Sequence, residues 1–179
     1  MNTNSAIPGY RTGTWKVDPE QSEISFSVRQ LVTKVHGRMT GFDIAIVSGD
    51  DPSLSSVSAT IDLASVDTGN PKRDEHLRSA TFLDVANHPR VTYESTGVRR
   101  AGGGWVVDGD LTVHGVTRPV PLAVAATGFA ADPDCGGHAS FSATAVVDRT
   151  DFGIDGWTGG GVVGTKVRIS LAITAVLVS

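Results

Sequence analysis

Apolar side chains recur at every second position along most of this 179-residue chain, and that period constrains the fold more than any other feature of the sequence. Ile24, Phe26 and Val28 alternate with polar residues in one segment, and Trp105 and Leu111 share an apolar parity in another. A period of two is that of a β-strand with one buried face and one wet face. We therefore expect an all-β chain, with strands at about residues 14–18, 24–28, 35–47, 57–61, 90–99, 105–113, 118–129, 138–148 and 166–177.

The expected strands follow one another closely and are joined by glycine-containing turns, such as residues 101–104 and 114–117. Sequential strands of this kind favour an up-and-down antiparallel meander, whose edges are protected most simply by closure into a barrel. The expected fold class is a single extended antiparallel eight-stranded barrel. At eight strands the interior is either filled by side chains or holds one small ligand, so the strand count leaves the function open.

The length of the chain fits one domain, which we assign to residues 14–179, after a flexible N-terminal segment at residues 1–13. Asn70 followed by Pro71 is typical of a helix start and predicts a short helix near residues 71–79, with an ion pair between Asp74 and Arg78. Residues 151–164 contain Trp157 and three consecutive glycines, and we expect a long mobile loop there that covers a cavity mouth.

Composition argues against several classes of function. A net charge of −4 and a pI of about 5.6 disfavour electrostatic binding to nucleic acid or to an anionic membrane. Cys135 is the single cysteine, so no intrachain disulfide is available. The sequence shows neither a secretory signal pattern nor an apolar run long enough to span a membrane. We expect a cytoplasmic protein without a nucleic-acid partner or stable membrane insertion.

The residue patterns that usually mark an enzyme or a cofactor site are missing from the sequence. The five histidines are scattered, with no helical i,i+4 pair among them, and they are His36, His76, His88, His114 and His138. No serine lies in a Gly-x-Ser-x-Gly elbow, and the glycines at 102–104 lack the Lys-Ser/Thr ending of a phosphate-binding loop. We therefore expect no metal, no cofactor and no catalytic residue.

The densest group of charges, at residues 73–78, favours a solvated helix face over an anion-binding or acid–base site. Residues 148–151 are likewise more typical of a turn at the end of a strand than of a catalytic carboxylate pair.

Several segments together resemble the YceI family of lipocalin-like, polyisoprenoid-binding proteins. In chain order they are WKVDPEQS (15–22), VHGRM (35–39), SVDTG (65–69), RDEHLRS (73–79), FLDV (82–85), HP (88–89), GDLTVHGVT (109–117) and DRTDFGI (148–154). The resemblance runs from about residue 14 to the C-terminus, and its specificity lies in the order of the motifs. It implies an extended lipocalin-like barrel with a helix near one end and an elongated apolar pore that holds an isoprenoid chain or a similar amphiphile.

The chain also departs from that family. Gln21 and Gln30 stand where relatives often have histidine, which argues against a metal or proton-transfer role in this chain. Many relatives are exported, whereas this sequence shows no signal. The resemblance makes a homodimer reasonable.

The apolar parity of the strands predicts which side chains line the interior and contact the ligand. We expect these to be Phe26, Val28, Met39, Val91, Tyr93, Trp105, Leu111, Val113, Leu122, Phe141, Trp157, Ile169 and Leu171. A charged head group is expected near Arg73, His76 or Arg78. The expected function is to carry or sequester a polyisoprenoid or fatty-acyl lipid.

Three alternatives stay open at the level of sequence. The apolar side chains can fill a solid core that leaves no room for a ligand. The chain can be a small enzyme that acts on a lipid through Asp74, His76 and Asp151. It can also be a ligand-free structural barrel with a role in stress response or in binding a protein partner.

Overall fold

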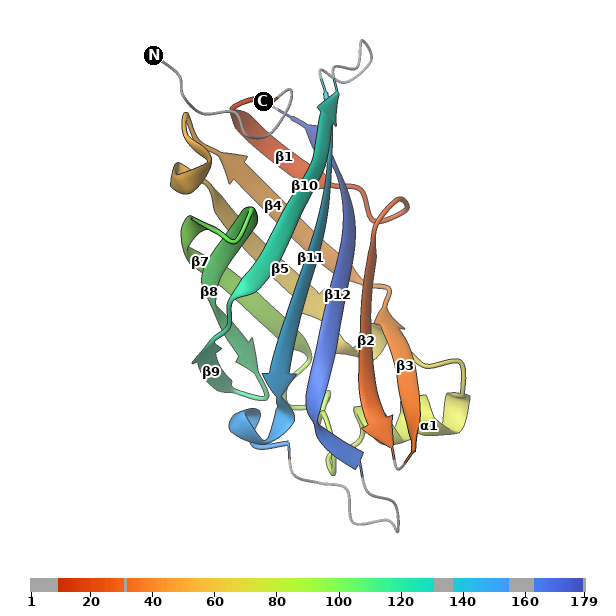
Figure 1. Cartoon of the computed structure of the whole chain (residues 1–179). Coiled ribbons are helices and arrows are strands. Elements are labelled where there is room, and N and C mark those ends of the chain that lie inside the picture. Colours follow the sequence, from red (N-terminus) through yellow and green to blue (C-terminus); the bar gives the residue numbers. More distant parts are fainter. Residues whose placement is uncertain (1–9, 31, 131–136, 155–162, 179) are drawn as a thin grey trace.

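The computed structural model describes residues 10–30, 32–130, 137–154 and 163–178, whose strands form one closed sheet (Figure 1). The strands are β1 (Gly13–Val17), β2 (Glu23–Gln30), β3 (Thr33–Met39), β4 (Phe42–Ser48), β5 (Ser56–Asp62), β6 (Val66–Asp67), β7 (Arg90–Ala101), β8 (Gly104–Val113), β9 (Val116–Pro119), β10 (Leu122–Ala130), β11 (His138–Asp148) and β12 (Val163–Leu177). The helices are α1 (Pro71–Arg78) and the single-turn helices η1 (Pro52–Leu54), η2 (Leu63–Ser65) and η3 (Arg149–Phe152). Most of the N-terminal segment expected to be flexible, residues 1–9, lies outside this description.

The strands of the sheet are parts of eight long antiparallel strands, because four of the long strands are interrupted. β1 and β2 both run antiparallel to β12, with Val17 opposite Ala175 and Glu23 opposite Ala172, so they are two parts of one strand. β3 with β4, β5 with β6, and β9 with β10 are related in the same way. The sheet closes where β1 pairs with β12, while β2, β3 and β6 extend one end. The expected eight-stranded barrel is confirmed.

Two segments expected as continuous strands are broken. The strand expected at residues 118–129 is divided between β9 and β10, because Pro119 and Pro121 have no N–H to donate to the sheet. The strand expected at residues 35–47 is divided between β3 and β4 at Thr40–Gly41, where the chain passes from pairing with β6 to pairing with β5.

The Ser22 side chain completes the sheet in the gap between the end of β1 and the start of β2. The Ser22 hydroxyl donates to the Thr174 carbonyl oxygen at 3.3 Å and accepts from the Thr174 N–H at 2.9 Å. The hydroxyl therefore takes the place of a backbone partner, and β12 stays hydrogen-bonded across the gap.

The short helix α1 confirms the helix expected near residues 71–79. The Asn70 side chain accepts from the N–H groups of Lys72 at 3.1 Å and Arg73 at 3.2 Å, and Pro71 occupies the first turn, where its missing N–H costs nothing. None of the helices in the described part of the chain is long and apolar enough to cross a membrane.

The ion pair expected between Asp74 and Arg78 is not formed among the described residues. Asp74 turns inward, is 8% exposed, and accepts hydrogen bonds from the N–H and the hydroxyl of Thr68. Arg78 Nη1 instead donates to the Ala64 carbonyl oxygen at 3.5 Å. The carboxylate gains more from two buried donors than from a solvent-exposed partner, because exposed ion pairs stabilise little.

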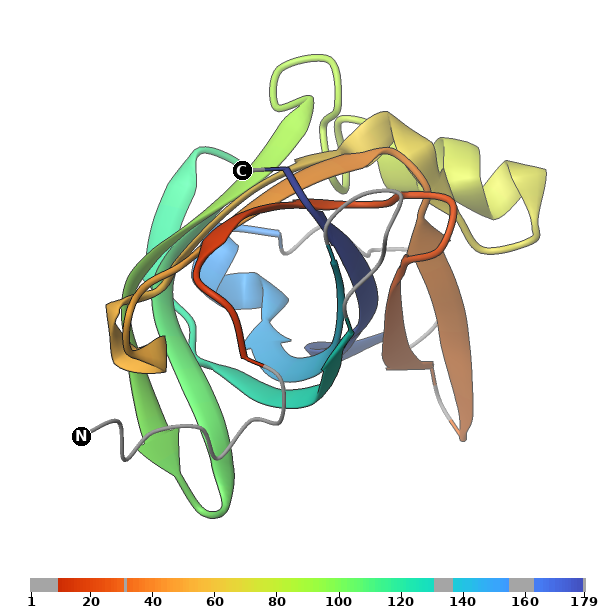
Figure 2. The ribbon, with the colours of Figure 1, turned by 90° about the horizontal axis from the view of Figure 1, so that it is seen from above.

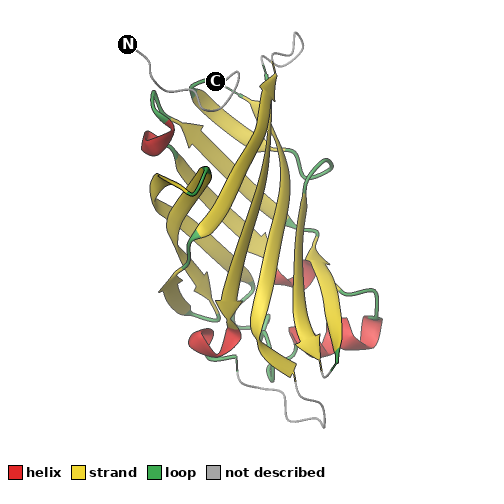
Figure 3. Ribbon diagram, in the orientation of Figure 1, coloured by secondary structure: helices red, strands yellow, loops and turns green. Residues whose placement is uncertain are grey.

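Irregular segments close the barrel end that lies opposite the chain termini. Figure 2, which looks down the barrel, shows η3 across the opening and α1 outside the sheet, and Figure 3 shows both at the same end. Phe152 and Ile154 are 2% and 5% exposed, so this closure is a packed one.

Hydrogen bonds from the hydroxyl and N–H of Thr150 lower the pKa of Asp148 from its ordinary value and fix the start of η3.

Candidate functional site

The barrel interior holds two apolar cavities that lie end to end. The upper cavity, toward the chain termini in Figure 1, has a volume of about 190 Å³, and the lower cavity, toward α1 and η3, about 230 Å³. Ile24, Ile61, Leu111 and Ile169 border both cavities, so we call these four residues the central ring. The interior is therefore not completely filled by side chains.

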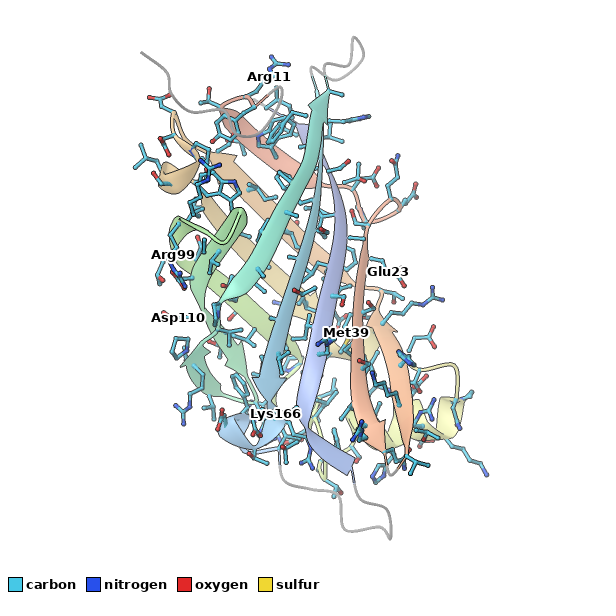
Figure 4. The ribbon with its side chains drawn as sticks, in the orientation of Figure 1. Arg11, Glu23, Met39, Arg99, Asp110 and Lys166 are labelled. Carbon is cyan, nitrogen blue, oxygen red and sulfur yellow. The ribbon has the colours of Figure 1, made fainter. Side chains whose placement is uncertain are left out.

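The inward parity of the strands places the sequence-predicted contact residues at these cavities. The upper cavity is bordered by Tyr93, Trp105, Leu111, Leu122, Phe141, Ile169 and Leu171. The lower cavity is bordered by Phe26, Val28, Met39, Val91, Leu111, Val113 and Ile169. Trp157 lies outside the described residues. Glu23 and Lys166 have the opposite parity and are exposed (Figure 4). That the inward residues contact a ligand stays a prediction.

Small side chains at inward positions leave the space in the upper cavity. Ala59, Ala143 and Ala145 border this cavity and are buried. Ala123 and Ala125, on the neighbouring strand β10, are exposed and leave no space inside. The difference follows from parity, because Ala123 and Ala125 alternate along β10 with Leu122 and Val124, which border the cavity.

Aromatic rings gather at the upper end of the interior. Phe129 meets Tyr10, Trp15 and Phe141 edge to face, with ring centroids 5.4, 5.3 and 5.6 Å away. Such pairs contribute about 0.5–1.5 kcal/mol each beyond the area they bury. The Tyr10 hydroxyl also donates to the Gly49 carbonyl oxygen at 2.7 Å, which ties the chain before β1 to the barrel. Sequence analysis did not include Tyr10, Trp15 or Phe129 among the site residues.

Tyr93 joins the wall of the upper cavity to the connection between β9 and β10. Its hydroxyl donates to the Val120 carbonyl oxygen at 2.8 Å, and its ring lies over Gly109, where a Cβ would be 2.4 Å from Tyr93 Cζ. Burial, with smaller contributions from the charges of Asp108 and Asp110, raises the pKa of Tyr93 to about 12. The phenol therefore stays neutral and keeps its donor at physiological pH.

The lower cavity differs from the upper one because cationic side chains border it. Arg73 comes from α1 and Arg149 from η3. Arg73 Nε donates to Thr68 Oγ1 at 2.8 Å, and Arg149 Nε donates to the Gly164 carbonyl oxygen at 3.1 Å. These bonds hold both arginine side chains beside a cavity whose wall is almost entirely apolar. The sequence analysis interpreted residues 148–151 as a turn and so missed Arg149.

The three predicted head-group residues have different surroundings. Arg73 borders the lower cavity, whereas His76 and Arg78 border neither cavity. His76 lies beside Phe82, with ring centroids 6.5 Å apart.

The candidate catalytic set of Asp74, His76 and Asp151 is divided between two elements. Asp74 and His76 belong to α1, while Asp151 is exposed on η3, and the two helices lie apart in both Figure 1 and Figure 2. None of the three borders either cavity.

Outside the cavities, Asp84, His88 and His114 offer ligand atoms that all lie within 4.8 Å of one another. Spacings between histidines alone do not reveal this group, because His88 and His114 are 26 positions apart. The four-residue spacing between Asp84 and His88 is the local sequence signal of the group.

Comparisons with known proteins agree with this architecture. A family model described as a YceI-like domain matches residues 15–175. A UPF0312 protein from Yersinia pestis (strain Pestoides F) is 36% identical over 168 residues, which cover 92% of this chain and 86% of that protein. A UPF0312 protein from Serratia proteamaculans (strain 568) is 39% identical over 144 residues, which cover 78% and 75%.

Two solved structures show the same fold at low sequence identity. Burkholderia cenocepacia BcnA has a TM-score of 0.80 and 23% identity, over 88% of this chain and 98% of that chain. A polyisoprenoid binding domain from Saccharophagus degradans, implicated in plant cell wall breakdown, has a TM-score of 0.70 and 14% identity, over 93% and 99%. The family match and the curated relatives span most of the chain, and the protein therefore belongs to the YceI family.

Proposed function

We propose that this protein binds a long-chain amphiphile of the polyisoprenoid or fatty-acyl type inside the barrel, and sequesters or carries it without altering it chemically. The observation that carries this proposal is the pair of apolar cavities that share the central ring. A flexible chain that passes the ring occupies both spaces, whereas a rigid polycyclic ligand fits only one of them.

The energetics favour a long apolar chain in this interior. Burial of each CH₂ contributes about 0.8 kcal/mol, so about ten buried methylenes contribute about 8 kcal/mol before the cost of ordering the chain. The apolar lining offers few polar contacts, so the affinity for a ligand depends mainly on how much apolar chain it buries.

The arginines support one orientation of the ligand. Arg73 and Arg149 border the lower cavity, while the upper cavity ends in the aromatic rings around Phe129. An acidic head group at the lower end gains charge-assisted hydrogen bonds from a guanidinium group. We therefore expect a fatty acid to bind more tightly than the fatty alcohol of the same length, and equal affinities would contradict this orientation.

Mass spectrometry of the protein's own lipid tests the proposal. Protein purified without added lipid is extracted with organic solvent, and the stripped protein is then offered polyprenyl and fatty-acyl lipids. We expect a long-chain amphiphile in the extract, or saturable uptake by the stripped protein. Absence of both would contradict the proposal. Turnover of an added lipid that disappears in His76→Ala would favour the enzyme alternative.

A pair of alanine variants tests where the ligand lies. Ala143→Phe places a ring in the upper cavity, whereas Ala125→Phe adds the same ring to an exposed position on the neighbouring strand. We expect Ala143→Phe to lower affinity for long chains more than for short ones, while Ala125→Phe binds like the parent. Thermal unfolding of both variants shows whether each is folded. Equal binding by the two variants would place the ligand outside the upper cavity.

A further inference from the structure

Asp84, His88 and His114 form a compact group of ligand atoms on the barrel wall, outside the two cavities. One atom from each side chain lies within 4.8 Å of the other two, and all three residues are half-buried. The imidazole rings have centroids 4.7 Å apart and are tilted by 49°. No described carboxylate forms an ion pair with either of the two histidines.

The local backbone brings Asp84 and His88 together. The Asp84 carbonyl oxygen accepts from the N–H of His88 at 2.8 Å, so the two residues close a single α-type turn. The turn leaves the two side chains close together, with their ligand atoms within 4.8 Å of each other. The Asn87 amide donates to both carboxylate oxygens of Asp84, at 3.2 and 3.0 Å, and holds the carboxylate in place.

The third residue comes from the turn between β8 and β9. His114 and Gly115 have φ values of 56° and 76°, the combination that a two-residue type I′ hairpin requires and that Asn-Gly satisfies best. His88 lies over this turn, because a Cβ on Gly115 would be 3.1 Å from His88 Cε1. Asp84, with a φ of 51°, and His114 are the only non-glycine residues with positive φ in the described part of the chain. Both strained positions therefore belong to this one group, and strained backbone tends to cluster at functional sites.

We propose that Asp84, His88 and His114 bind a divalent first-row transition metal ion, with Zn²⁺ as the representative ion. Two imidazoles and one carboxylate suit Zn²⁺ and its neighbours, whereas Ca²⁺ and Mg²⁺ prefer sites made of oxygen ligands. Tetrahedral coordination with bonds of about 2.0–2.2 Å brings ligand atoms to about 3.4 Å from each other. Rotation of the two half-buried imidazoles toward the fixed carboxylate supplies this contraction, and the fourth position is left to solvent.

The place of the site indicates what the ion does. Leu83 and Val113 border the lower cavity, and each directly precedes one of the proposed ligands in the sequence. β9 and η3 lie next to each other at this end (Figure 1). A bound ion joins the segment after α1 to the β8–β9 turn and so braces the wall of the lower cavity. The site does not depend on the proposed lipid, because its residues lie outside both cavities.

Titration of tag-free, chelator-treated protein with Zn²⁺, followed by calorimetry, tests the proposal. We expect one Zn²⁺ per chain and a thermal unfolding midpoint that rises with Zn²⁺ but not with Mg²⁺. Co²⁺ bound at the same site gives visible ligand-field absorption. Loss of the outer hydrogen bond in Asn87→Ala is expected to weaken Zn²⁺ binding about 10-fold to 100-fold.

Two variants remove ligands while keeping the backbone. His114→Asn creates the preferred Asn-Gly turn, and Asp84→Asn keeps a residue type that tolerates positive φ. We expect each variant to weaken Zn²⁺ binding at least as much as Asn87→Ala does. The control His36→Gln, at an exposed position on β3, should leave Zn²⁺ binding unchanged. Saturable binding that His114→Asn does not weaken would overturn the proposal, as would the absence of saturable binding by the parent protein.

Discussion

Tyr93→Phe removes one hydroxyl from the wall of the upper cavity and tests the account of that wall. In the parent protein the hydroxyl donates to the carbonyl oxygens of Val120 at 2.8 Å and Val107 at 3.2 Å, and Tyr93 is 6% exposed. Loss of a buried donor leaves these acceptors less satisfied and costs about 1–2 kcal/mol at neutral pH. Chemical denaturation of both proteins measures this difference.

The same variant gives a second, pH-dependent signature. The pKa of Tyr93 is raised from 10.0 to about 12 in the folded protein, so its stabilising contribution is complete below pH 10 and is lost as the pH rises toward 12. The difference between these two pKa values predicts that the parent protein loses about 1.4 kcal/mol of its free energy of unfolding by pH 11. The stability difference between the parent and Tyr93→Phe should therefore shrink between pH 10 and pH 11. Parallel pH dependence of the two proteins would refute the reasoning, as would a phenolate signal near pH 10 that is present in the folded parent and missing from Tyr93→Phe.

Three further substitutions test other parts of the fold by chemical denaturation. Gly37→Ala places a Cβ 2.4 Å from the ring of Phe26 on β2 and is expected to lower the free energy of unfolding by about 1–3 kcal/mol. Gly97→Ala, where a Cβ meets nothing within 4 Å, should lower it less. Equal effects of the two substitutions would contradict the packing around Gly37. Asn70→Ala removes the cap of α1 and should cost about 1 kcal/mol, most of which Asn70→Ser restores; no loss in Asn70→Ala would show that the cap is unimportant. Trp15→Phe loses the indole hydrogen bond to Ser48 Oγ at 2.9 Å and should cost about 1–3 kcal/mol, and a neutral result would argue against that bond.

The period of two predicted the strands and their inward residues, because parity decides which face of a strand is buried, and closure into a barrel followed from the need to protect the sheet edges. Phe26 and Val28 on β2, and Leu111 on β8, border the interior as their alternation indicates. The interruptions were harder to predict. Ser22 replaces a backbone partner of Thr174, and that contact joins residues 152 positions apart, a distance over which local patterns carry no information.

Charged residues of the lower end were predicted less well for the same reason. Asp74 and Arg78 have the spacing of a surface ion pair, but the fold presents Thr68 to Asp74, and the carboxylate becomes buried. Arg149 borders the lower cavity only because η3 folds across the barrel end. The convergence of His88 and His114 likewise depends on two turns that are distant in sequence.

The central claim is that one apolar chain occupies both cavities and passes the central ring of Ile24, Ile61, Leu111 and Ile169. A crystal structure of protein saturated with a long polyprenyl or fatty-acyl lipid measures this directly. The account predicts continuous tubular density from the aromatic rings near Phe129 to Arg73 and Arg149. Density confined to the outer surface, or an interior left empty beside excess lipid, would contradict it.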